Sequence, residues 1–321
     1  MPFTVRPFAL DDYPAFLEVR NAVFPDYAVS VEEARHWDEN LGPKCLFKRT
    51  VALRDGTIVG AGEFRQIPWT YDPHGFRLEI TVHLSERGRG AGSAIFEHLI
   101  LAMRPHEPRV LRTMTRATDE AGARFLLKRG FVREQSNWES RIDLTAFDPS
   151  PYAGLEETLA REGIRLRTLR ELRAENGWQR KLHALFWAAE QGMPDEEAHN
   201  QIEFETFDAL LCNDPFLVDD AFIVAAHGGD FIGLSYVRES RKNLDATTGL
   251  TGVIPEWRGR KIALAMKVRS LATAKALGFP SSKTWNDTRN GAMLAVNVRL
   301  GFVRNVEWVQ YVKNLEPEES P

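Results

Sequence analysis

The sequence predicts an α/β protein built from two tandem domains, and three observations lead to this prediction. Its length of 321 residues is typical of about two domains. Segments with the period-2 alternation of strands and segments with the apolar spacing of helices follow one another along the chain. A strand, an arginine-rich loop with glycine and a helix occur together twice, once in each half. We therefore expect each half to form a domain of its own.

The two copies are related by one constant offset. Val82 and Val253, at the ends of the two predicted strands, lie 171 positions apart (253 − 82). Three further pairs have the same offset: Arg87 and Arg258, Gly130 and Gly301, and Phe131 and Phe302. A constant offset over this length indicates an internal repeat rather than coincidence.

The composition is that of a globular protein without a charge-driven partner. Hydrophobic residues make up 43% and charged residues 27%, and the net charge is −4 with a pI near 6.1. This balance gives no general attraction to nucleic acid or to an anionic membrane. Cys45 and Cys212 lie in different halves without metal-ligand spacing, so we expect no disulfide and no metal site. No long apolar run or signal-peptide core is found, which makes the cytoplasm the expected location.

The first domain, residues 1–147, is predicted to alternate between strands and helices. Predicted strands cover residues 3–7, 46–53, 58–67, 76–83, 109–115 and 131–144. A hairpin turn at Asp55-Gly56 joins the second of these strands to the third. Predicted helices cover residues 11–23, 31–40, the segment after the loop, and 119–129, which ends at Gly130.

A proline-rich break, residues 148–154, begins the linker, which we place at residues 148–163 and which includes a short helix. The second domain, residues 164–315, repeats the order of the first. Predicted strands cover residues 164–169, 221–226, 231–237, 246–253 and 283–286, and predicted helices cover residues 176–190, 203–211, 262–277 and 291–300. The acidic residues 316–321 are predicted to be a disordered tail.

The first loop has the features of an anion site. It runs Arg87-Gly88-Arg89-Gly90-Ala91-Gly92-Ser93. Its glycines allow a sharp turn and a close approach to a ligand, the helix N-terminus offers unpaired N–H groups, and the arginines match phosphate oxygens. The loop lacks the Lys-Ser/Thr of a P-loop and the register of a dinucleotide fingerprint. Taken alone, it is equally consistent with a plain strand–helix turn that carries solvated arginines.

Together with its second copy, this loop resembles the acetyl-CoA loop of the GNAT superfamily of acetyltransferases, Arg/Gln-x-x-Gly-x-Gly/Ala. The first loop matches this pattern fully. The second loop matches it except at one position, and runs Arg258-Gly259-Arg260-Lys261-Ile262-Ala263. Lys261 replaces the central glycine there, but it keeps its backbone N–H and adds an ammonium group that can meet phosphate. A later helix that ends in Gly-Phe, also a family feature, is present in both halves.

The resemblance covers nearly the whole chain and is to the tandem members of the family. It implies both a fold and a cofactor. Each domain is then a mixed, mostly antiparallel sheet flanked by helices, and each loop binds the pyrophosphate of acetyl-CoA. The strand before the loop separates from its neighbour, and its N–H groups bond the pantetheine and the thioester oxygen. By position, these groups belong to Val82, His83 and Leu84 in the first half and to Val253 and Ile254 in the second.

Acetylation of an amine requires a base for the amine proton and an acid for the leaving thiolate. Glu79 and His83 lie on one face of the predicted strand 76–83, so each is a candidate base. The alternative is an outward-facing polar row on a half-exposed strand. The family often places a tyrosine acid four residues before Gly-Phe, but this sequence has Leu126 and Asn297 there. Neither half therefore has that tyrosine.

The second half carries asparagines at positions where family members often use asparagine to bond CoA or to orient the thiol. These residues are Asn286, Asn290 and Asn297. Asn290 and Asn297 are two helical turns apart and share one face, while capping by Asn286 or Asn290 is the alternative role. The first half has the complete loop and the candidate bases, so we expect it to be the catalytic half.

The sequence therefore predicts an N-acetyltransferase that uses acetyl-CoA and a primary amine, and we expect the acceptor to be a small molecule. We expect a monomer or homodimer with no nucleic-acid or membrane partner. The alternative is a non-catalytic CoA-binding sensor or scaffold, which the missing tyrosines favour. Measurement of turnover with amines beside CoA binding separates these two functions.

Overall fold

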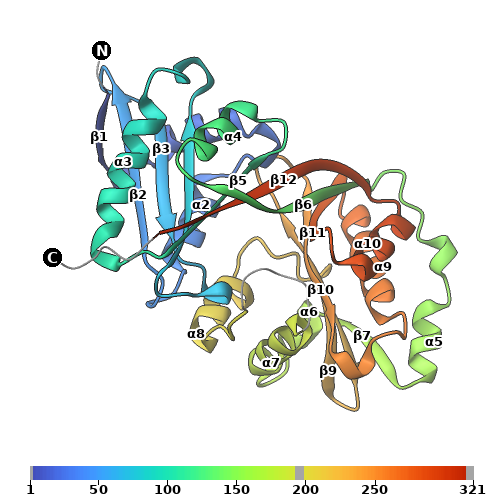
Figure 1. The fold of residues 1–321 in the computed structure, drawn as a ribbon. Helices are drawn as coiled ribbons and strands as arrows, with labels where there is room; N and C mark the ends of the chain where they lie inside the picture. Colours follow the sequence, from blue (N-terminus) through green and yellow to red (C-terminus); the bar gives the residue numbers. More distant parts are fainter. Residues whose placement is uncertain (1–2, 192–198, 316–321) are drawn as a thin grey trace. The chain divides into compact units, whose positions relative to one another are not determined.

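The chain forms two units in the computed structural model, which describes residues 3–191 and 199–315 (Figure 1). The first unit contains the residues up to 136 and those from 307 onward, and the second contains residues 137–306. Each unit contains a mixed sheet and several helices, as the sequence predicts. The predicted tail, residues 316–321, lies outside the described residues.

The first unit is built on a sheet whose strands are β1 (Thr4–Pro7), β2 (Phe47–Arg54), β3 (Thr57–Arg65), β4 (Gly75–Val82), β5 (Val110–Arg116) and the later part of β12 (Val303–Asn314). They lie in the order β1-β2-β3-β4-β5-β12. Neighbouring strands are antiparallel except β4 and β5, which are parallel.

The helices of the first unit are α1 (Tyr13–Val23), α2 (Val31–Glu39), α3 (Ala91–Met103) and α4 (Glu120–Leu127). Helix α2 begins at a capping box, in which the Glu33 N–H donates to Ser30 Oγ (3.1 Å) and the Ser30 N–H donates to Glu33 Oε2 (2.7 Å). Helix α3 buries Ile95, Leu99 and Met103, spaced four residues apart, in the core that contains β4. This packing fixes the start of α3, and with it the end of the first loop.

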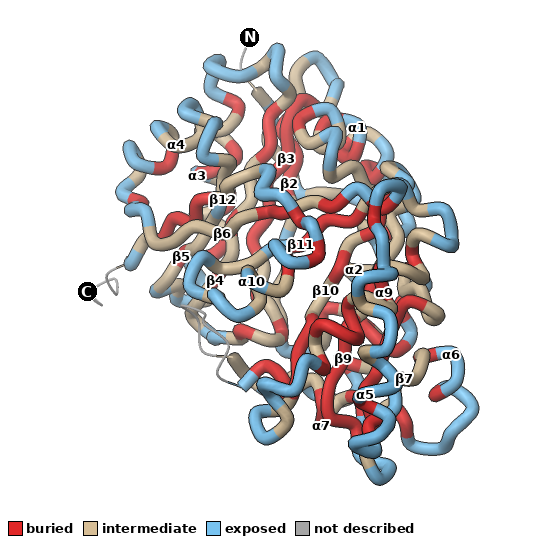
Figure 2. The backbone as a smooth tube through the Cα atoms, turned by 90° about the vertical axis from the view of Figure 1, so that its right-hand side faces the viewer, coloured by how far each residue is buried: buried red, intermediate tan, exposed pale blue. Residues whose placement is uncertain are grey.

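The second unit is built on the later part of β6 (Val132–Asp143) with β7 (Ile164–Thr168), β8 (Ile223–His227), β9 (Asp230–Glu239), β10 (Ala246–Val253) and β11 (Ser281–Asp287). They lie in the order β6-β11-β10-β9-β8-β7. Here β10 and β11 are the parallel neighbours, and the others are antiparallel. Figure 2 shows buried backbone along β9 and β10.

The α-helices of the second unit are α5 (Leu155–Arg161), α6 (Leu169–Leu172), α7 (Trp178–Glu190), α8 (Phe204–Phe207), α9 (Ile262–Ala276) and α10 (Gly291–Leu300). The predicted helix 203–211 is α8 followed by one π-helical turn, Asp208–Cys212. Helix α9 buries Ile262, Ala265 and Met266 in the same core as β8 and β9. None of the described helices is long and apolar enough to cross a membrane.

The first unit receives a strand from the far end of the sequence, and the second unit, residues 137–306, begins within strand β6 of the first half. From Trp308 to Asn314, β12 pairs with β5, and Val309 and Tyr311 are buried in the core of the first unit. From Asn137 to Asp143, β6 pairs with β11, and Ile142 is buried in the second unit. The two units are therefore not two consecutive stretches of sequence.

This exchange makes the units differ from the domains placed by sequence at 1–147 and 164–315. Residues 137–147 lie in the second unit and residues 307–315 in the first. Residues 132–143 form one continuous strand rather than several, and residues 303–314 form a strand that the sequence analysis did not predict. Alternation identifies a strand but not its neighbours, so it could not reveal the exchange.

Candidate active site

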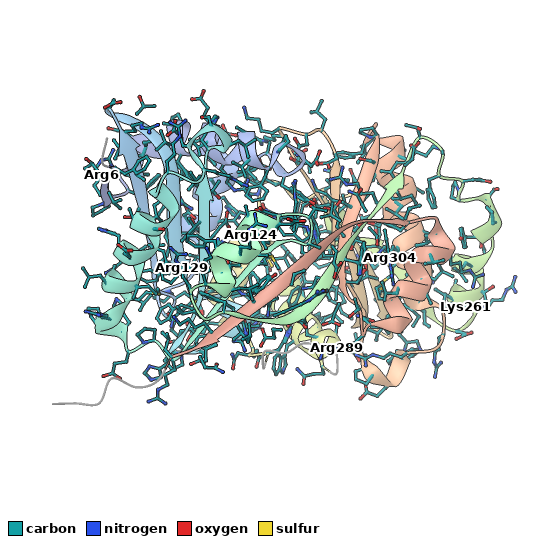
Figure 3. The ribbon with its side chains drawn as sticks, turned by 45° about the horizontal axis from the view of Figure 1, so that its top comes forward. Arg6, Arg124, Arg129, Lys261, Arg289 and Arg304 are labelled. Atoms are coloured by element: carbon teal, nitrogen blue, oxygen red, sulfur yellow. The ribbon has the colours of Figure 1, made fainter. Side chains whose placement is uncertain are left out.

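Both loops adopt the same backbone conformation. Each begins with a turn of 3₁₀ helix, which is followed by a glycine in the left-handed region, Gly88 at φ 75° and Gly259 at φ 79°. The helix N-cap that ends the loop is also left-handed, Gly90 at φ 101° in the first half and Lys261 at φ 63° in the second. This conformation is costly for a residue with a Cβ atom. Lys261, labelled in Figure 3, therefore occupies a strained position.

The helix after each loop presents backbone donors at its N-terminus. The Ala94 N–H donates to Gly90 O and the Ala265 N–H donates to Lys261 O, each at 3.0 Å. The amides before these bonds have no partner within the helix, and they face a positive dipole end that favours an anion. Predicted binding residues supply them: Ala91, Gly92, Ser93, Ile262 and Ala263.

One predicted side chain is already engaged in the first half. Ser93 Oγ accepts a hydrogen bond from Arg129 Nη2 at 2.7 Å. The Arg129 guanidinium, labelled in Figure 3, also lies 3.6 Å from the centre of the Phe125 ring. The Ser93 hydroxyl is therefore held by Arg129, and it keeps its own O–H donor beside the backbone N–H.

The first arginine of each loop points back into the loop. Arg87 Nε donates to Val82 O at 3.4 Å, and Arg258 Nε donates to Val253 O at 2.9 Å. Arg258 Nη2 also donates to two carbonyl groups at the C-terminal end of α7, at 2.8 and 3.4 Å. The sequence analysis assigned both arginines to the pyrophosphate. In the structure both arginines hold the loop, and Arg258 additionally fastens it to α7. Their assignment to the pyrophosphate stays a prediction.

The second arginine of each loop is more open to solvent. The side chains of Arg89 and Arg260 are 54% and 49% exposed. Their acidic neighbours are distant, with Glu86 at 4.0 Å from Arg89 and Glu162 at 3.8 Å from Arg260. Exposed ion pairs of this kind contribute little. Both guanidinium groups can therefore turn to a phosphate beside the helix N-terminus.

In both sheets, the strand before the loop separates from its parallel neighbour. β4 pairs with β5 only from Gly75 to Arg77. β10 pairs with β11 only at Ala246 and Thr247. Beyond these residues no pairing joins the two strands in the described sheets, so one edge of β4 and one edge of β10 are open.

Backbone alternation decides which amides face this opening. Alternate residues of a strand direct their N–H groups to opposite edges. The His83 N–H donates to a carbonyl of β3 at 2.9 Å, and the Ile254 N–H donates to a carbonyl of β9 at 3.0 Å. The N–H groups of Val82 and Val253 therefore face the open edges, whereas those of His83 and Ile254 have partners in the sheet. Leu84 begins the 3₁₀ turn and its side chain is exposed.

Strand β10 has an irregularity that β4 lacks. Its register with β9 shifts between Thr248 and Thr251, whereas the register of β4 with β3 is continuous. At this bulge the backbone passes close over a ring, because a Cβ atom added to Gly249 would lie 2.1 Å from Tyr236 Cε2. Bulges are common beside active sites, since they redirect backbone groups.

A cavity of about 320 Å³ lies in the second unit, where β10 and β11 separate. It is lined by residues 247–251 of β10, residues 284–287 of β11, and Lys267, Asn290, Met293 and His199. The matching region of the first half contains core side chains instead. Phe96 and Leu126 are 9% and 7% exposed and share one apolar cluster.

The three asparagines of the second half have different roles. Asn290 Oδ1 accepts from the Met293 N–H at 3.2 Å and caps α10, as the capping alternative predicts. Asn297 Nδ2 donates to Asn286 Oδ1 at 2.6 Å. Asn297 Oδ1 in turn accepts from Lys267 Nζ at 2.5 Å. Asn286 and Asn297 are thus parts of one polar chain that leads to a lysine beside the cavity.

The two candidate bases of the first half are each held by other groups. The Glu79 side chain is 43% exposed and lies 3.8 Å from Arg65 and 3.9 Å from Arg20. His83 Nδ1 lies 2.8 Å from Ser85 Oγ, within the 3₁₀ turn. The structure puts both residues on the same strand–loop junction, and their assignment as bases stays a prediction.

Sequence analysis missed Lys267. A lysine on a helix is ordinarily solvated, but this one is 1% exposed, and burial lowers its pKa to about 7. Comparison of the two copies of the repeat could have identified this lysine. Lys267 and Phe96 are 171 positions apart, as are Asn297 and Leu126. A polar pair at positions that are apolar in the other copy marks a specialised site.

Comparison with known proteins agrees with this geometry. Residues 11–131 match the profile of the Acetyltransferase (GNAT) family. The mycothiol acetyltransferase of Thermobispora bispora is 28% identical over 240 residues, which cover 73% of this chain and 74% of the relative. The mycothiol acetyltransferase of Streptomyces coelicolor is 24% identical over 261 residues, 81% of this chain and 78% of the relative.

Solved structures show the same two-unit fold. A tandem GNAT protein from the clavulanic acid biosynthesis pathway superimposes with a TM-score of 0.77 at 19% identity, covering 99% of this chain and all of the other. A GCN5-related N-acetyltransferase from Sphaerobacter thermophilus gives 0.70 at 20% identity, covering 98% of this chain and 96% of the other. The repeated loops, the separated strands and these similarities lead to one conclusion: the chain is an acyltransferase whose residues 11–131 match the GNAT family and whose fold is similar to that of tandem GNAT proteins.

Proposed function

We propose that this acyltransferase moves an acetyl group from acetyl-CoA to a primary amine of a small molecule, and that the transfer takes place in the second half. The observation that carries the choice of half is the cavity between β10 and β11. Family membership and the anion-binding features of the loops support acetyl-CoA as the donor. The name shared by the relatives, mycothiol acetyltransferase, supports a small-molecule acceptor.

Residues of the second half suit the separate needs of the reaction. The N-terminus of α9 and the exposed Arg260 offer donors to the pyrophosphate. The Val253 N–H faces the open edge of β10, where a thioester oxygen would gain from a fixed hydrogen bond as charge develops on it. This arrangement departs from the sequence-based choice of the first half as the catalytic one.

The proposed activity is tested by measuring release of CoA from acetyl-CoA with a panel of small primary amines. Calorimetry with CoA is carried out on the same protein. We expect saturable CoA binding together with amine-dependent release of CoA. Binding without turnover for any amine would support the alternative function, a CoA-binding sensor or scaffold. Absence of both would remove acetyl-CoA as the donor.

The choice of half is tested with charge substitutions at equivalent N-cap positions. Gly90→Asp and Lys261→Asp each place a carboxylate where a phosphate is expected, and repulsion should weaken CoA binding at the altered loop. Gly90→Asn and Lys261→Asn are controls of the same shape without the charge. We expect the larger loss of turnover in Lys261→Asp.

The opposite result would return the chemistry to the first half. Loss of turnover in Gly90→Asp alone, together with a lowered rate in Glu79→Gln or His83→Gln, would support the sequence-based assignment of those two residues as bases.

A further inference from the structure

Lys267 is a buried lysine that has no acidic partner among residues 3–191 and 199–315. Its Nζ donates to Asn297 Oδ1 at 2.5 Å and lies 4.8 Å from the centre of the Phe302 ring. Of the described residues, none places a carboxylate within ion-pair distance of this ammonium. A lysine ammonium has three N–H donors, and Asn297 accepts one of them. The group therefore has donors left for a ligand in the cavity that it lines.

The repeat shows that the fold does not require this lysine. The three positions 171 residues earlier hold Phe96, Leu126 and Phe131, all buried in one apolar cluster. The Phe96 and Phe131 rings are 6.4 Å apart, in the place where the second half has Lys267 and Phe302. Burial of an unpaired ammonium costs several kcal/mol relative to such a packed apolar group. A charge kept against that cost is a strong candidate for a functional group.

The surroundings of Lys267 favour the binding of a transient anion, one that forms during a reaction. The groups that β10 and α10 contribute are neutral: Thr251 and Asn290 line the same cavity as Lys267, and Asn297 accepts its hydrogen bond. Besides Lys267, the titratable residues in the described lining of the cavity are His199 and Asp287. Asp287 is 2.7 Å from Arg289, and His199 is 3.6 Å from Glu190, so each has a counter-charge of its own. Acyl transfer from a thioester creates a thiolate, which is an anion of this kind.

We propose that Lys267 is the proton donor to the thiolate that leaves acetyl-CoA in the second half. The proposal rests on the proposed function, and it supplies the acid that the absent tyrosine would have provided at position 297. Asn297, which holds Lys267, is the positioning residue, and Asn286 fixes the orientation of Asn297.

The step balances without another reactant. The amine nitrogen attacks the thioester carbonyl carbon, the C–S bond breaks, and its electron pair stays on sulfur. Lys267 Nζ gives the sulfur a proton, which leaves the CoA thiol and a neutral lysine. The amine loses one proton to solvent and the lysine regains one from solvent. An ammonium with a pKa of about 7 gives its proton readily to a thiolate, because a thiol has a pKa of about 8.5.

The first test asks whether Lys267 faces the sulfur, and it needs no acceptor. Two probes are compared by calorimetry at pH 6: CoA oxidised to its sulfonate, which is a permanent anion at the sulfur position, and desulfo-CoA, which has hydrogen there. We expect Lys267→Met to lose about tenfold or more of its affinity for the sulfonate while it keeps its affinity for desulfo-CoA. Equal changes for both probes overturn the proposal.

The second test follows the pH dependence of turnover, with the amine that reacts best in the panel. In the wild type, the rate should fall as pH rises through about 7, because the acid must be protonated. Lys267→Met should be slower by about 100-fold at pH 6 and should lack this descending limb. A loss of rate with an unchanged pH profile means a structural role and overturns the proposal.

Two further variants complete the design. Phe96→Met alters the corresponding position of the first half and should change neither measurement. Asn297→Asp places a carboxylate beside the ammonium, so the descending limb should move to higher pH. If the descending limb of the pH–rate profile stays at the same pH in Asn297→Asp, the assignment of the titrating group to Lys267 is overturned. If no amine is acetylated, the proposed function fails, and the affinity comparison still decides the role of Lys267.

Discussion

At the scale of single residues, the two loops differ most at the helix N-cap. Gly90 occupies the left-handed region without cost, whereas Lys261 holds the same conformation at φ 63° with a side chain attached. That conformation costs a residue with a Cβ atom about 1–2 kcal/mol relative to ordinary backbone. The strain is kept at a position where an ammonium can reach a bound phosphate. We interpret Lys261 as a residue that lowers the stability of the fold and in return provides a contact to a ligand.

Lys261→Gly should therefore raise the free energy of unfolding, by about 0.5–1 kcal/mol once the greater flexibility of glycine in the unfolded chain is included. Urea denaturation measures the change. Lys261→Ala is the matched control, since it removes the ammonium and keeps the strain. If alanine stabilises the protein as much as glycine, charge rather than backbone conformation is the cause.

Lys267 makes stability depend on pH. Its folded pKa of about 7 lies below the unfolded value of about 10.4, so between these values the unfolded chain binds more protons. The wild type should gain stability as pH rises across this window, and the cost of the buried charge is fully present below pH 7. Lys267→Met should be more stable than the wild type by about 1–4 kcal/mol at pH 6, with a smaller difference at pH 9. Thermal unfolding at the two pH values measures this; a difference that grows with pH would contradict the assignment.

At the scale of elements, Arg258 joins a loop to a helix end. Its guanidinium satisfies carbonyl groups at the end of α7 as well as Val253 O, whereas Arg87 makes one long hydrogen bond of 3.4 Å to Val82 O and a part-exposed ion pair of 3.6 Å with Asp119. Hydrogen bonds from a charged donor contribute about 1.5–3 kcal/mol when they are well formed. The second loop is therefore held more firmly than the first.

Arg258→Met should destabilise the protein by about 1–3 kcal/mol and increase amide exchange at the C-terminal end of α7. Arg87→Met is the matched variant, and it should cost less than about 1 kcal/mol, because it removes one weak hydrogen bond and one part-exposed ion pair. Hydrogen exchange with peptide resolution measures the change in amide exchange in both variants. Equal effects from the two variants would mean that the contacts to α7 add nothing.

Much of the element pattern follows from the sequence, and the finer features of the site do not. Helix α10 and strand β10 occupy the predicted residues 291–300 and 246–253 because their apolar spacing is regular. The bulge in β10 and the separation from β11 depend on tertiary packing, such as Tyr236 beneath Gly249, and leave no local pattern. The sharp turn of each loop before a helix was predictable from its glycines, while anion binding by the loops stays a prediction. The burial of Lys267 could be predicted only by comparing the two halves of the sequence.

At the scale of the whole molecule, β12 ties the core of the first unit to the distant end of the chain, and β6 carries residues of the first half into the core of the second unit. Val309 comes near the end of the sequence and is 3% exposed in the core of the first unit. Ile142 comes from the first half of the sequence and is 4% exposed in the core of the second unit. Neither core is complete without its borrowed strand.

Val309→Ala should destabilise the first unit by about 2–4 kcal/mol, and Ile142→Ala should do the same to the second unit. Hydrogen exchange shows where protection is lost: in β4 and β5 for Val309→Ala, and in β10 and β11 for Ile142→Ala. Loss of protection that follows sequence position instead, with Ile142→Ala loosening β4, would contradict the division into these units.

The placement of β12 also has a consequence for synthesis. A ribosome makes the chain from the N-terminus, so residues 308–314 emerge after the other strands of both described sheets. Until then, the edge of β5 that will pair with β12 has no partner from its own sheet, and an unpaired edge can join a neighbouring chain. The first unit therefore stays incomplete while the whole of the second unit is being made. Slow elongation through residues 137–306 should raise aggregation before it affects activity.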